Sequence, residues 1–281
     1  MKKNDYFSRN LPKILSLISK QKYLSELQLL QVFNESNQNA LIAHNLSFHN
    51  FLLRLIDEGL AQYNITIRNH LKTRYTLDKH LDIYAFCHTL ETNSYFPMTT
   101  SLNIQGLSDY RSNYIFISKE RTKRATFADK KLRQEDIDRA FAKPPRRTTA
   151  HDKIGDYIVI MLETNNTSAF DITEHQGYKI SSTSRTFVEI VSNVHYFESS
   201  DQALVLFHEI KDHLNVDKIY DIIERFDFVY PYFQLAGFYL EQIGFDKEAL
   251  KRFYARKSAL KFYAQKNKEA YLFDEYWGVY Y

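Results

Sequence analysis

Three helical stretches in succession limit what the first 81 residues can fold into. Apolar residues recur at helical spacing from residue 10 to 19, after Ser25 and after Ser47. A serine hydroxyl caps a helix N-terminus because it accepts a hydrogen bond from an otherwise unpaired backbone N–H, and Gly59 suits the left-handed position that ends a helix. We therefore predict three short amphipathic helices packed on one another.

Two alternating segments follow the third helix. Residues 63–67 and 74–77 alternate between apolar and polar side chains, which is typical of half-buried strands, and the polar residues 68–72 form a hairpin tip between them. Three helices followed by a hairpin is the element order of a winged helix-turn-helix. We predict such a domain for residues 1–81.

A winged helix presents two surfaces to a DNA duplex. Its third helix fits the major groove, and a basic hairpin reaches the neighbouring phosphates. Asn50 has the donor and acceptor pattern that pairs with adenine, and Arg54 can pair with guanine or with a phosphate. Alternatively, the domain docks another protein and these side chains only face water. The residues predicted to bind DNA are Ser47, His49, Asn50 and Arg54 on the helix and Arg68, Lys72 and Arg74 in the hairpin.

The remaining residues, 82–281, are numerous enough for a second domain with its own core, since 44% of the chain is hydrophobic. The expected strands come before most of the expected helices, which is typical of an α+β domain with a helical C-terminal half. A short helix is expected between Pro97 and Gly106. The expected strands are 114–118, 157–162, 170–173 and 178–180, and the later helices are 200–212, 215–226, 231–244 and 246–264.

The charge of the chain is segregated along the sequence, although the whole protein carries only +3. Residues 1–81 hold 11 Lys and Arg against 6 Asp and Glu, residues 119–147 hold 11 against 5, and residues 247–268 hold 8 against 1. The rest of the chain is therefore acidic. Because binding to a polyanion depends on where charge lies, each basic block is a candidate for contact with nucleic acid.

The block at 119–147 is expected to be a basic loop or helix face within the second domain. Such runs usually stay in water, which makes direct phosphate contact the weaker interpretation. In that interpretation the secondary phosphate contacts are made by Arg121, Lys123, Arg124, Lys130, Lys131, Arg146 and Arg147.

The block at 247–268 falls largely within the helix expected at 246–264, where aromatic residues are interleaved with the cations. Cations neutralise phosphates and aromatic rings stack on exposed bases, so this basic helix is a candidate for nucleic-acid binding. The favoured alternative is an amphipathic helix whose aromatic stripe, with Phe253 and Phe262, packs on the domain while its cations face water.

An enzymatic function is not supported by any complete set of catalytic residues. Asp156 and Glu163 flank the strand expected at 157–162, and carboxylates at strand ends can hold Mg²⁺, as in a nuclease. A restriction-type nuclease also needs a lysine soon after the second carboxylate, and none follows Glu163. A divergent nuclease therefore ranks below both the DNA-binding protein and the protein-docking module.

Histidine and cysteine spacing does not indicate a metal or cofactor site either. His208 and His213 are five residues apart and so do not share a helix face, and His175 and His195 have no ligand spacing. The apolar neighbours of Cys87 indicate a core thiol. We predict a protein that is not an enzyme and holds neither metal nor cofactor.

The sequence favours the cytoplasm. Cys87 is the only cysteine, so no intramolecular disulfide can form. Lys2 and Lys3 resemble the start of a signal peptide, but the apolar residues after them recur at helical spacing, which favours an amphipathic helix. Apolar runs such as 157–162 are far shorter than the roughly 20 residues that span a bilayer.

Several segments occur in an order that resembles the AbiEi family, the antitoxins and transcriptional regulators of type IV toxin-antitoxin (abortive infection) systems. Thr100–Ser108 is similar to a Ser/Thr-Ala-Leu element followed by His-Gly-Leu, and Ile180–Glu189 is similar to Ser-Pro-Glu-Arg-Thr-Leu-x-Asp. Leu235–Gly244 resembles a Leu-Gly-x-Leu-Leu-Glu-x-Leu-Gly helix. Leu55–Leu60, which ends the third helix, and Trp277–Val279 also fit the family pattern.

The chain departs from that pattern at three positions. Gln105 stands where the family tends to have His, Ser184 where it has Glu, and Glu189 where it has Asp. Any role of these three positions beyond packing, including one in antitoxin activity, is therefore expected to differ from that in the family. We expect Arg185 to pair with Glu189 one helical turn later and to stabilise the fold.

The resemblance implies a DNA-binding repressor that is also an antitoxin. Such a protein binds inverted repeats in double-stranded DNA upstream of its own operon, and opposes a nucleotidyltransferase-like toxin encoded alongside without forming a stable complex with it. The winged helix supports DNA binding and the C-terminal domain neutralises the toxin in phage defence. The main alternative is a protein-interaction module of a defence operon that never touches DNA.

Overall fold

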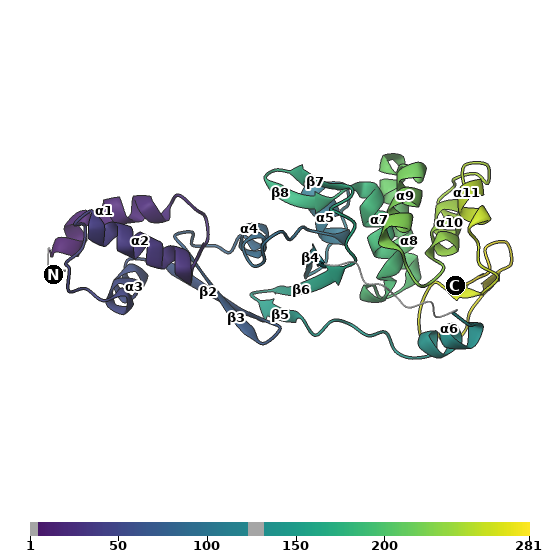
Figure 1. Ribbon diagram of the computed structural model, residues 1–281, viewed down its shortest axis with the longest axis horizontal. Helices are drawn as coiled ribbons and strands as arrows, with labels where there is room; N and C mark the ends of the chain where they lie inside the picture. The colour runs from purple at the N-terminus through teal and green to yellow at the C-terminus, as the bar shows by residue number, and fades with distance from the viewer. Residues whose placement is uncertain (1–4, 123–131) are drawn as a thin grey trace. The chain divides into compact units, whose positions relative to one another are not determined.

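The computed structural model describes residues 5–122 and 132–281 (Figure 1). Its helices and short sheets form a mixed α+β architecture, as the sequence predicted. The chain divides into two compact units. The first comprises residues up to Thr92 together with Ala150–Val159, and the second comprises Asn93–Thr149 and Ile160–Tyr281.

The first unit contains three helices, a fourth short helix and a small sheet. Strand β3 lies between β1 and β2 and is antiparallel to both. The helices are α1 (Tyr6–Ile18), α2 (Glu26–Gln38), α3 (Phe48–Asp57) and α4 (Ile83–His88), and the strands are β1 (Leu24–Ser25), β2 (Ala61–Ile67), β3 (His70–Thr76) and β5 (His151–Ile154).

Local caps fix the ends of these helices. Ser25 and Gln28 form a capping box at the start of α2, and the hydroxyl of Ser47 accepts a hydrogen bond from the backbone N–H of Asn50 at the start of α3. Gly59 follows α3 with a positive φ of 104°. Helices α1, α2 and α3 pack around one apolar core, whose most buried residues are Ile14, Leu29, Phe51 and Leu55.

The turn between β2 and β3 contains only two residues, Arg68 and Asn69. Both have positive φ angles, 52° and 63°, as in the tight hairpin turns whose twist matches that of the strands. The five-residue tip predicted at 68–72 is therefore too long. Lys72 lies within β3, paired with Ile65 of β2, because strand pairing continues up to Ile67 and His70, which flank the turn directly.

The first unit extends past the boundary that the sequence placed at residue 81. Phe86 and Cys87 of α4 are fully buried, and the Phe86 ring contacts that of Tyr23 edge-on, with centroids 5.7 Å apart. The chain also returns to this unit at β5, where the Asp152 carboxylate accepts a hydrogen bond from the backbone N–H of Thr66 at 2.7 Å. Residues distant in sequence from the helices and hairpin thus complete this unit.

The second unit holds the remaining helices and strands. Within the ranges that the structure describes, no helix is long and apolar enough to cross a membrane. Its helices are α5 (Met98–Gln105), α6 (Gln134–Phe141), α7 (Thr183–Ser192), α8 (Ser200–Ile210), α9 (Val216–Phe226), α10 (Tyr232–Gln242) and α11 (Lys251–Ala255), with 3₁₀ turns η1 (Val194–Tyr196) and η2 (Lys211–His213). Its strands are β4 (Tyr114–Glu120), most of β6 (Tyr157–Thr164), β7 (Ile172–His175), β8 (Tyr178–Ser181), β9 (Phe262–Tyr263), β10 (Phe273–Asp274) and β11 (Val279–Tyr280).

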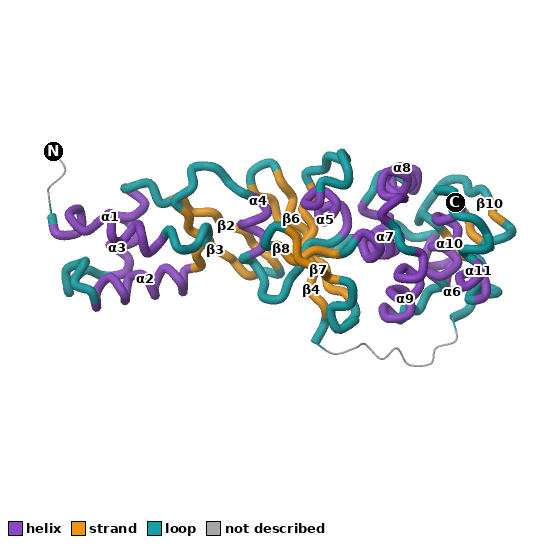
Figure 2. Tube along the Cα trace, turned by 90° about the horizontal axis from the view of Figure 1, so that it is seen from above, coloured by secondary structure: helices purple, strands orange, loops and turns teal. Residues whose placement is uncertain are grey.

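Helix α7 is the central element of the second unit. Every residue from Thr183 to Val191 is buried, as expected for a helix enclosed on all sides. It packs against α5, α8, α9 and α10. Strands β4, β6, β7 and β8 lie on one side of α7 and helices α8 to α11 on the other (Figures 1 and 2).

The single helix predicted for residues 246–264 is wrong. Only Lys251–Ala255 is α-helical at α11, and the chain then runs into β9, which pairs in parallel with β11. The fully buried side chain of Gln234 on α10 accepts a hydrogen bond from the N–H of Ser258 and donates to the carbonyl of Leu260. These partners satisfy the backbone groups that a continuous helix would have paired internally.

Glycine at position 237 allows a tryptophan to approach the backbone of α10. A Cβ atom at Gly237 would lie 2.3 Å from ring atoms of Trp277. The indole is fully buried, and its N–H donates a hydrogen bond to the carboxylate of Glu241 at 2.5 Å. The C-terminal strands are therefore attached to α10 through a contact that only glycine permits.

We expect Gly237→Ala to destabilise the protein by about 2 kcal/mol, because overpacking a filled core costs about 1–3 kcal/mol. The sign is informative, since Gly→Ala within a helix ordinarily stabilises by up to about 1 kcal/mol. Urea unfolding measures the change. In a Trp277→Leu background, Gly237→Ala should lower the free energy of unfolding much less. An equal decrease in that background would show that the contact with the Trp277 ring is not the cause.

Candidate nucleic-acid interface

The first turn of α3 presents polar side chains outward. Phe51 and Leu55 are fully buried, which orients the opposite face of the helix toward solvent. His49 and Asn50 are exposed on that face, and Ser47 is also exposed, although its hydroxyl is occupied as the helix cap. The structure thus brings three of the predicted side chains together at the N-terminal end of α3.

Arg54 connects α3 to the start of α1. Its guanidinium donates a hydrogen bond to the carboxylate of Asp5 at 2.5 Å and lies 5.3 Å from the centre of the Phe7 ring. The hydrogen bond from the backbone N–H of Ser8 and that from Arg54 together lower the pKa of Asp5 to about 2. Arg54 therefore remains half-exposed, but one side of it is committed to holding the two helices together.

The hairpin cations separate into two groups. Arg68 is exposed at the turn. Lys72 donates a hydrogen bond to the carbonyl of Leu90 at 2.6 Å, and Arg74 donates to the hydroxyl and carbonyl of Thr89 at 2.8 and 2.5 Å. Burial lowers the pKa of Arg74. Lys72 and Arg74 thus attach β3 to the segment after α4, and the structure does not place them with Arg68.

The basic block 119–147 is described only in part. Lys123, Arg124, Lys130 and Lys131 lie outside the described residues. Arg121, Arg146 and Arg147 are exposed in the second unit. The guanidinium of Arg147 donates hydrogen bonds to the hydroxyl of Tyr114 at 3.3 Å and to the carbonyl of His195 at 3.1 Å.

The two arginines of the basic block 247–268 are neutralised by their surroundings. Arg252 forms an ion pair with Asp217 and Arg256 forms one with Glu224, both at 2.7 Å. The guanidinium groups also lie over aromatic rings of α9 and α10, 4.1 Å from Tyr220 and 4.5 Å from Phe233. Phe253 and Phe262 are buried. These contacts support packing over nucleic-acid binding for this block.

Arg185 is the most completely enclosed charged side chain in the described part of the chain, with none of its side chain accessible to solvent. The predicted pair with Glu189 is confirmed: the Nε atom of Arg185 lies 2.9 Å from the Oε1 atom of Glu189. Its guanidinium also donates to the carboxylate of Glu120 at 3.0 Å and to the hydroxyl of Tyr95 at 2.9 Å. The carbonyl of Phe170 accepts a further hydrogen bond at 2.5 Å.

The carboxylates around Arg185 are themselves fully engaged. Burial alone would raise the pKa of Glu120, but hydrogen bonds from Thr167 and Ala169 and the charge of Arg185 lower it. Glu189 accepts further hydrogen bonds from the hydroxyl of Tyr95 and from Ser181, the latter at 2.7 Å. Because these donors and acceptors are paired with one another, this group of residues stabilises the fold.

Two of the departures from the family pattern have partners in the same region. The amide of Gln105 donates a hydrogen bond to the hydroxyl of Ser101 at 2.9 Å, and Ser101 donates to the carbonyl of Ser181 at 2.7 Å. The hydroxyl of Ser184 accepts a hydrogen bond from the backbone N–H of Asn215 at 3.0 Å. The segments 100–108 and 180–189 therefore pack together.

The residues considered for catalysis are dispersed. Asp156 and Glu163 lie near opposite ends of β6, about 23 Å apart along an extended chain, too far to share a metal ion. Cys87 is fully buried, and burial raises its pKa. Among the described residues, no three His, Cys, Asp or Glu side chains are grouped so that they could hold a metal ion.

The sequence matches no protein-family model, and no curated protein matches it. Among solved structures, the chain is similar to the RV2827C protein from Mycobacterium tuberculosis, with a TM-score of 0.60 and 9% sequence identity. The match covers 98% of this chain and 91% of that protein. At this identity the likeness concerns the fold alone, and it extends over nearly the whole chain.

We expect Arg185→Met to destabilise the protein by about 3–5 kcal/mol, because it leaves the buried carboxylate of Glu189 and the partly buried carboxylate of Glu120 without their cation. Arg185→Lys should recover little of this loss, since an ammonium cannot reproduce the planar set of donors. Urea unfolding checks both values. Adding Glu189→Gln to Arg185→Met should cost less than the sum of the single changes, and strict additivity would show that the two side chains do not interact.

Proposed function

We propose that this protein is a DNA-binding repressor of its own operon whose first unit is a winged helix-turn-helix. The proposal rests chiefly on the exposed polar end of α3, in a unit where three helices precede a tight hairpin with a cation at its turn. In this proposal α3 enters the major groove and the hairpin lies beside it. Double-stranded DNA is the partner.

The contacts of each side chain suggest its role. His49 and Asn50 contact base edges, because they are exposed on the first turn of α3. Arg68 contacts a phosphate from the hairpin turn. Lys72 and Arg74 position the hairpin, since their donors are directed to residues 89–91. Arg54 holds α3 against Asp5 and adds positive charge at the edge of the groove.

The antitoxin part of the proposal rests on the resemblance to the AbiEi family. The second unit opposes a nucleotidyltransferase-like toxin, acts in the cytoplasm and forms no stable complex with that toxin. The packing of segments 100–108 and 180–189 is consistent with this assignment. No catalytic step or cofactor enters the proposal.

The turn at Arg68 offers a clean test of DNA binding. Arg68→Asn removes the positive charge but keeps a side chain that tolerates the left-handed conformation of the turn. We expect weaker binding to the DNA upstream of the gene. The slope of the logarithm of the binding constant against the logarithm of salt concentration should also become shallower by about 1, as expected for the loss of one phosphate contact. Gel-shift titrations at several salt concentrations measure both effects.

Lys79→Ala is the matched control for this experiment. Lys79 is exposed in the same unit and follows the opposite end of the hairpin, so the net charge changes equally while the turn stays intact. Asn50→Ala should reduce the preference for this DNA over unrelated DNA. The repressor proposal would be contradicted by the absence of any gel shift at low salt, or by an equal loss of DNA affinity in the Arg68 and Lys79 variants.

The antitoxin role is tested separately by co-expression with the neighbouring gene. We expect the chain to relieve growth arrest caused by that gene, and the Arg68→Asn variant to relieve it equally, because neutralisation is assigned to the second unit. The two proteins should not co-purify. Growth arrest that persists at matched expression of a folded chain would remove this half of the proposal.

A second candidate function is protein docking by the first unit. Leu53 and Ile56 on α3 are 46% and 38% exposed, and with His49 they follow helical spacing along one outward stripe. An apolar stripe of this kind suits a protein partner. Retained activity in cells without any gel shift, together with loss of activity in a Leu53→Ser variant, would favour this alternative.

A further inference from the structure

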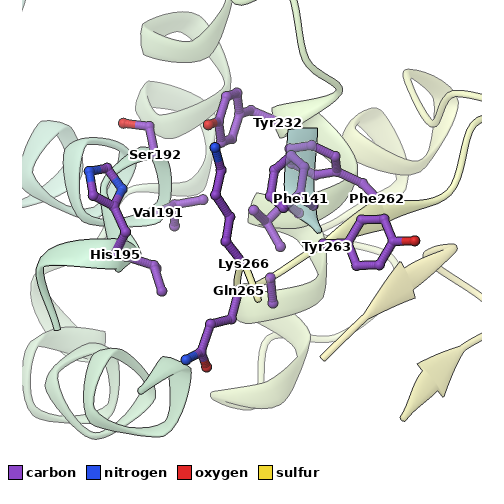
Figure 3. Close-up of a pocket in the computed structure, with 12 residues that line it drawn as sticks. Phe141, Val191, Ser192, His195, Tyr232, Phe262, Tyr263, Gln265 and Lys266 are labelled. Atoms are coloured by element: carbon purple, nitrogen blue, oxygen red, sulfur yellow. The ribbon is translucent and has the colours of Figure 1, made fainter. Parts of the chain in front are cut away.

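A small cavity in the second unit gathers positive charge between aromatic walls (Figure 3). Its volume is about 40 Å³. Lys266 extends through it, between the ring of His195 on one side and those of Phe141 and Phe262 on the other, and its amine end lies near Tyr232 (Figure 3). The walls come from α6, the end of α7, η1, the start of α10 and the residues after β9.

Two titratable side chains, His195 and Lys266, line this cavity, and the charges of Arg146 and Arg147 act on them from outside the lining. The ammonium of Lys266 lies 5.1 Å from the centre of the Phe141 ring, and Arg147 is attached to the backbone carbonyl of His195 at 3.1 Å. Burial and the charges of Lys266 and Arg147 lower the pKa of His195 to about 4. Burial and the charge of Arg146 lower the pKa of Lys266. Burial and the neighbouring cations therefore disfavour further positive charge in this cavity.

No carboxylate compensates this charge within the described parts of the chain. Ion pairs neutralise Arg252 and Arg256 elsewhere, but none of those observed among the described residues involves Lys266, Arg146 or Arg147. The carboxylate of Asp138 accepts a hydrogen bond from the hydroxyl of Tyr263 at 2.9 Å. Uncompensated like charges beside a partly buried cavity destabilise a fold, and a bound anion would relieve the repulsion.

We propose that this cavity binds a phosphate group, either as inorganic phosphate or as the phosphate end of a small phosphomonoester. Lys266 supplies the central charge, and lysine is a common phosphate ligand. Arg147, which is attached to the backbone carbonyl of His195, and its neighbour Arg146 add charge outside the lining, and the hydroxyl of Tyr232 supplies an uncharged donor within it. The small volume admits a compact anion and leaves the rest of a larger ligand outside.

This cavity lies in the second unit and shares no residue with the DNA contacts proposed for the first unit, so it is tested on the full chain without DNA. We expect inorganic phosphate to raise the melting temperature by several degrees more than chloride at the same ionic strength. Calorimetric titrations with inorganic phosphate and with glycerol 3-phosphate then distinguish the two sources. Tighter binding of glycerol 3-phosphate identifies a phosphomonoester site, and equal or weaker binding identifies free phosphate.

Lys266→Met is the decisive variant, and Lys268→Met is its control two residues along on the exposed surface. We expect Lys266→Met to weaken phosphate binding about tenfold or more. Without phosphate it should melt at or above the temperature of the wild type, because it removes the repulsion. Lys268→Met should bind as the wild type does.

Three results would overturn the proposal. The first is the absence of a phosphate effect in the wild type. The second is an equal loss of binding in the Lys266 and Lys268 variants, which would indicate general charge attraction. The third is a lower melting temperature of Lys266→Met without phosphate, which would show that the ammonium stabilises the empty cavity and is not repelled within it.

Discussion

The second unit depends on the burial of one guanidinium. Arg185 has no contact with solvent, and a buried charge is tolerated only when its donors find acceptors. Those acceptors come from distant parts of the chain: Glu120 at the end of β4, Tyr95 before α5, Phe170 before β7 and Glu189 on α7 itself. The sheet and the helices must all be in place before the charge is satisfied, which couples the β-rich and helical sides of α7.

The sequence predicted those features that neighbouring residues decide. The caps at Ser25 and Ser47 and the Arg185–Glu189 pair are all visible at spacings of three or four residues. The exposed end of α3 follows from the same local pattern, so that part of the candidate site was predictable. The roles of Lys72 and Arg74 were not, because their partners at residues 89–91 belong to a segment whose packing the sequence does not reveal.

Long-range competition for backbone hydrogen bonds explains the largest error. The region 246–264 has helical spacing of its aromatic residues, yet Gln234 and strand β11 pair with its backbone and end the helix at α11. Individual cations within the basic blocks also differ in ways that composition conceals. Arg252 and Arg256 are paired with acids, Lys72 and Arg74 are used internally, and Lys266 is left beside other cations.

The path of the chain affects how this protein can be dissected. Strand β5 follows about 60 residues after the rest of the first unit, and Asp152 covers the backbone of Thr66 on the outer strand β2. A fragment that stops at Thr92 would therefore leave β2 as an open edge, which is prone to pair with other chains. To express the first unit alone, residues 150–159 must be joined to residues 1–92 by a linker or by circular permutation, because simple truncation removes β5.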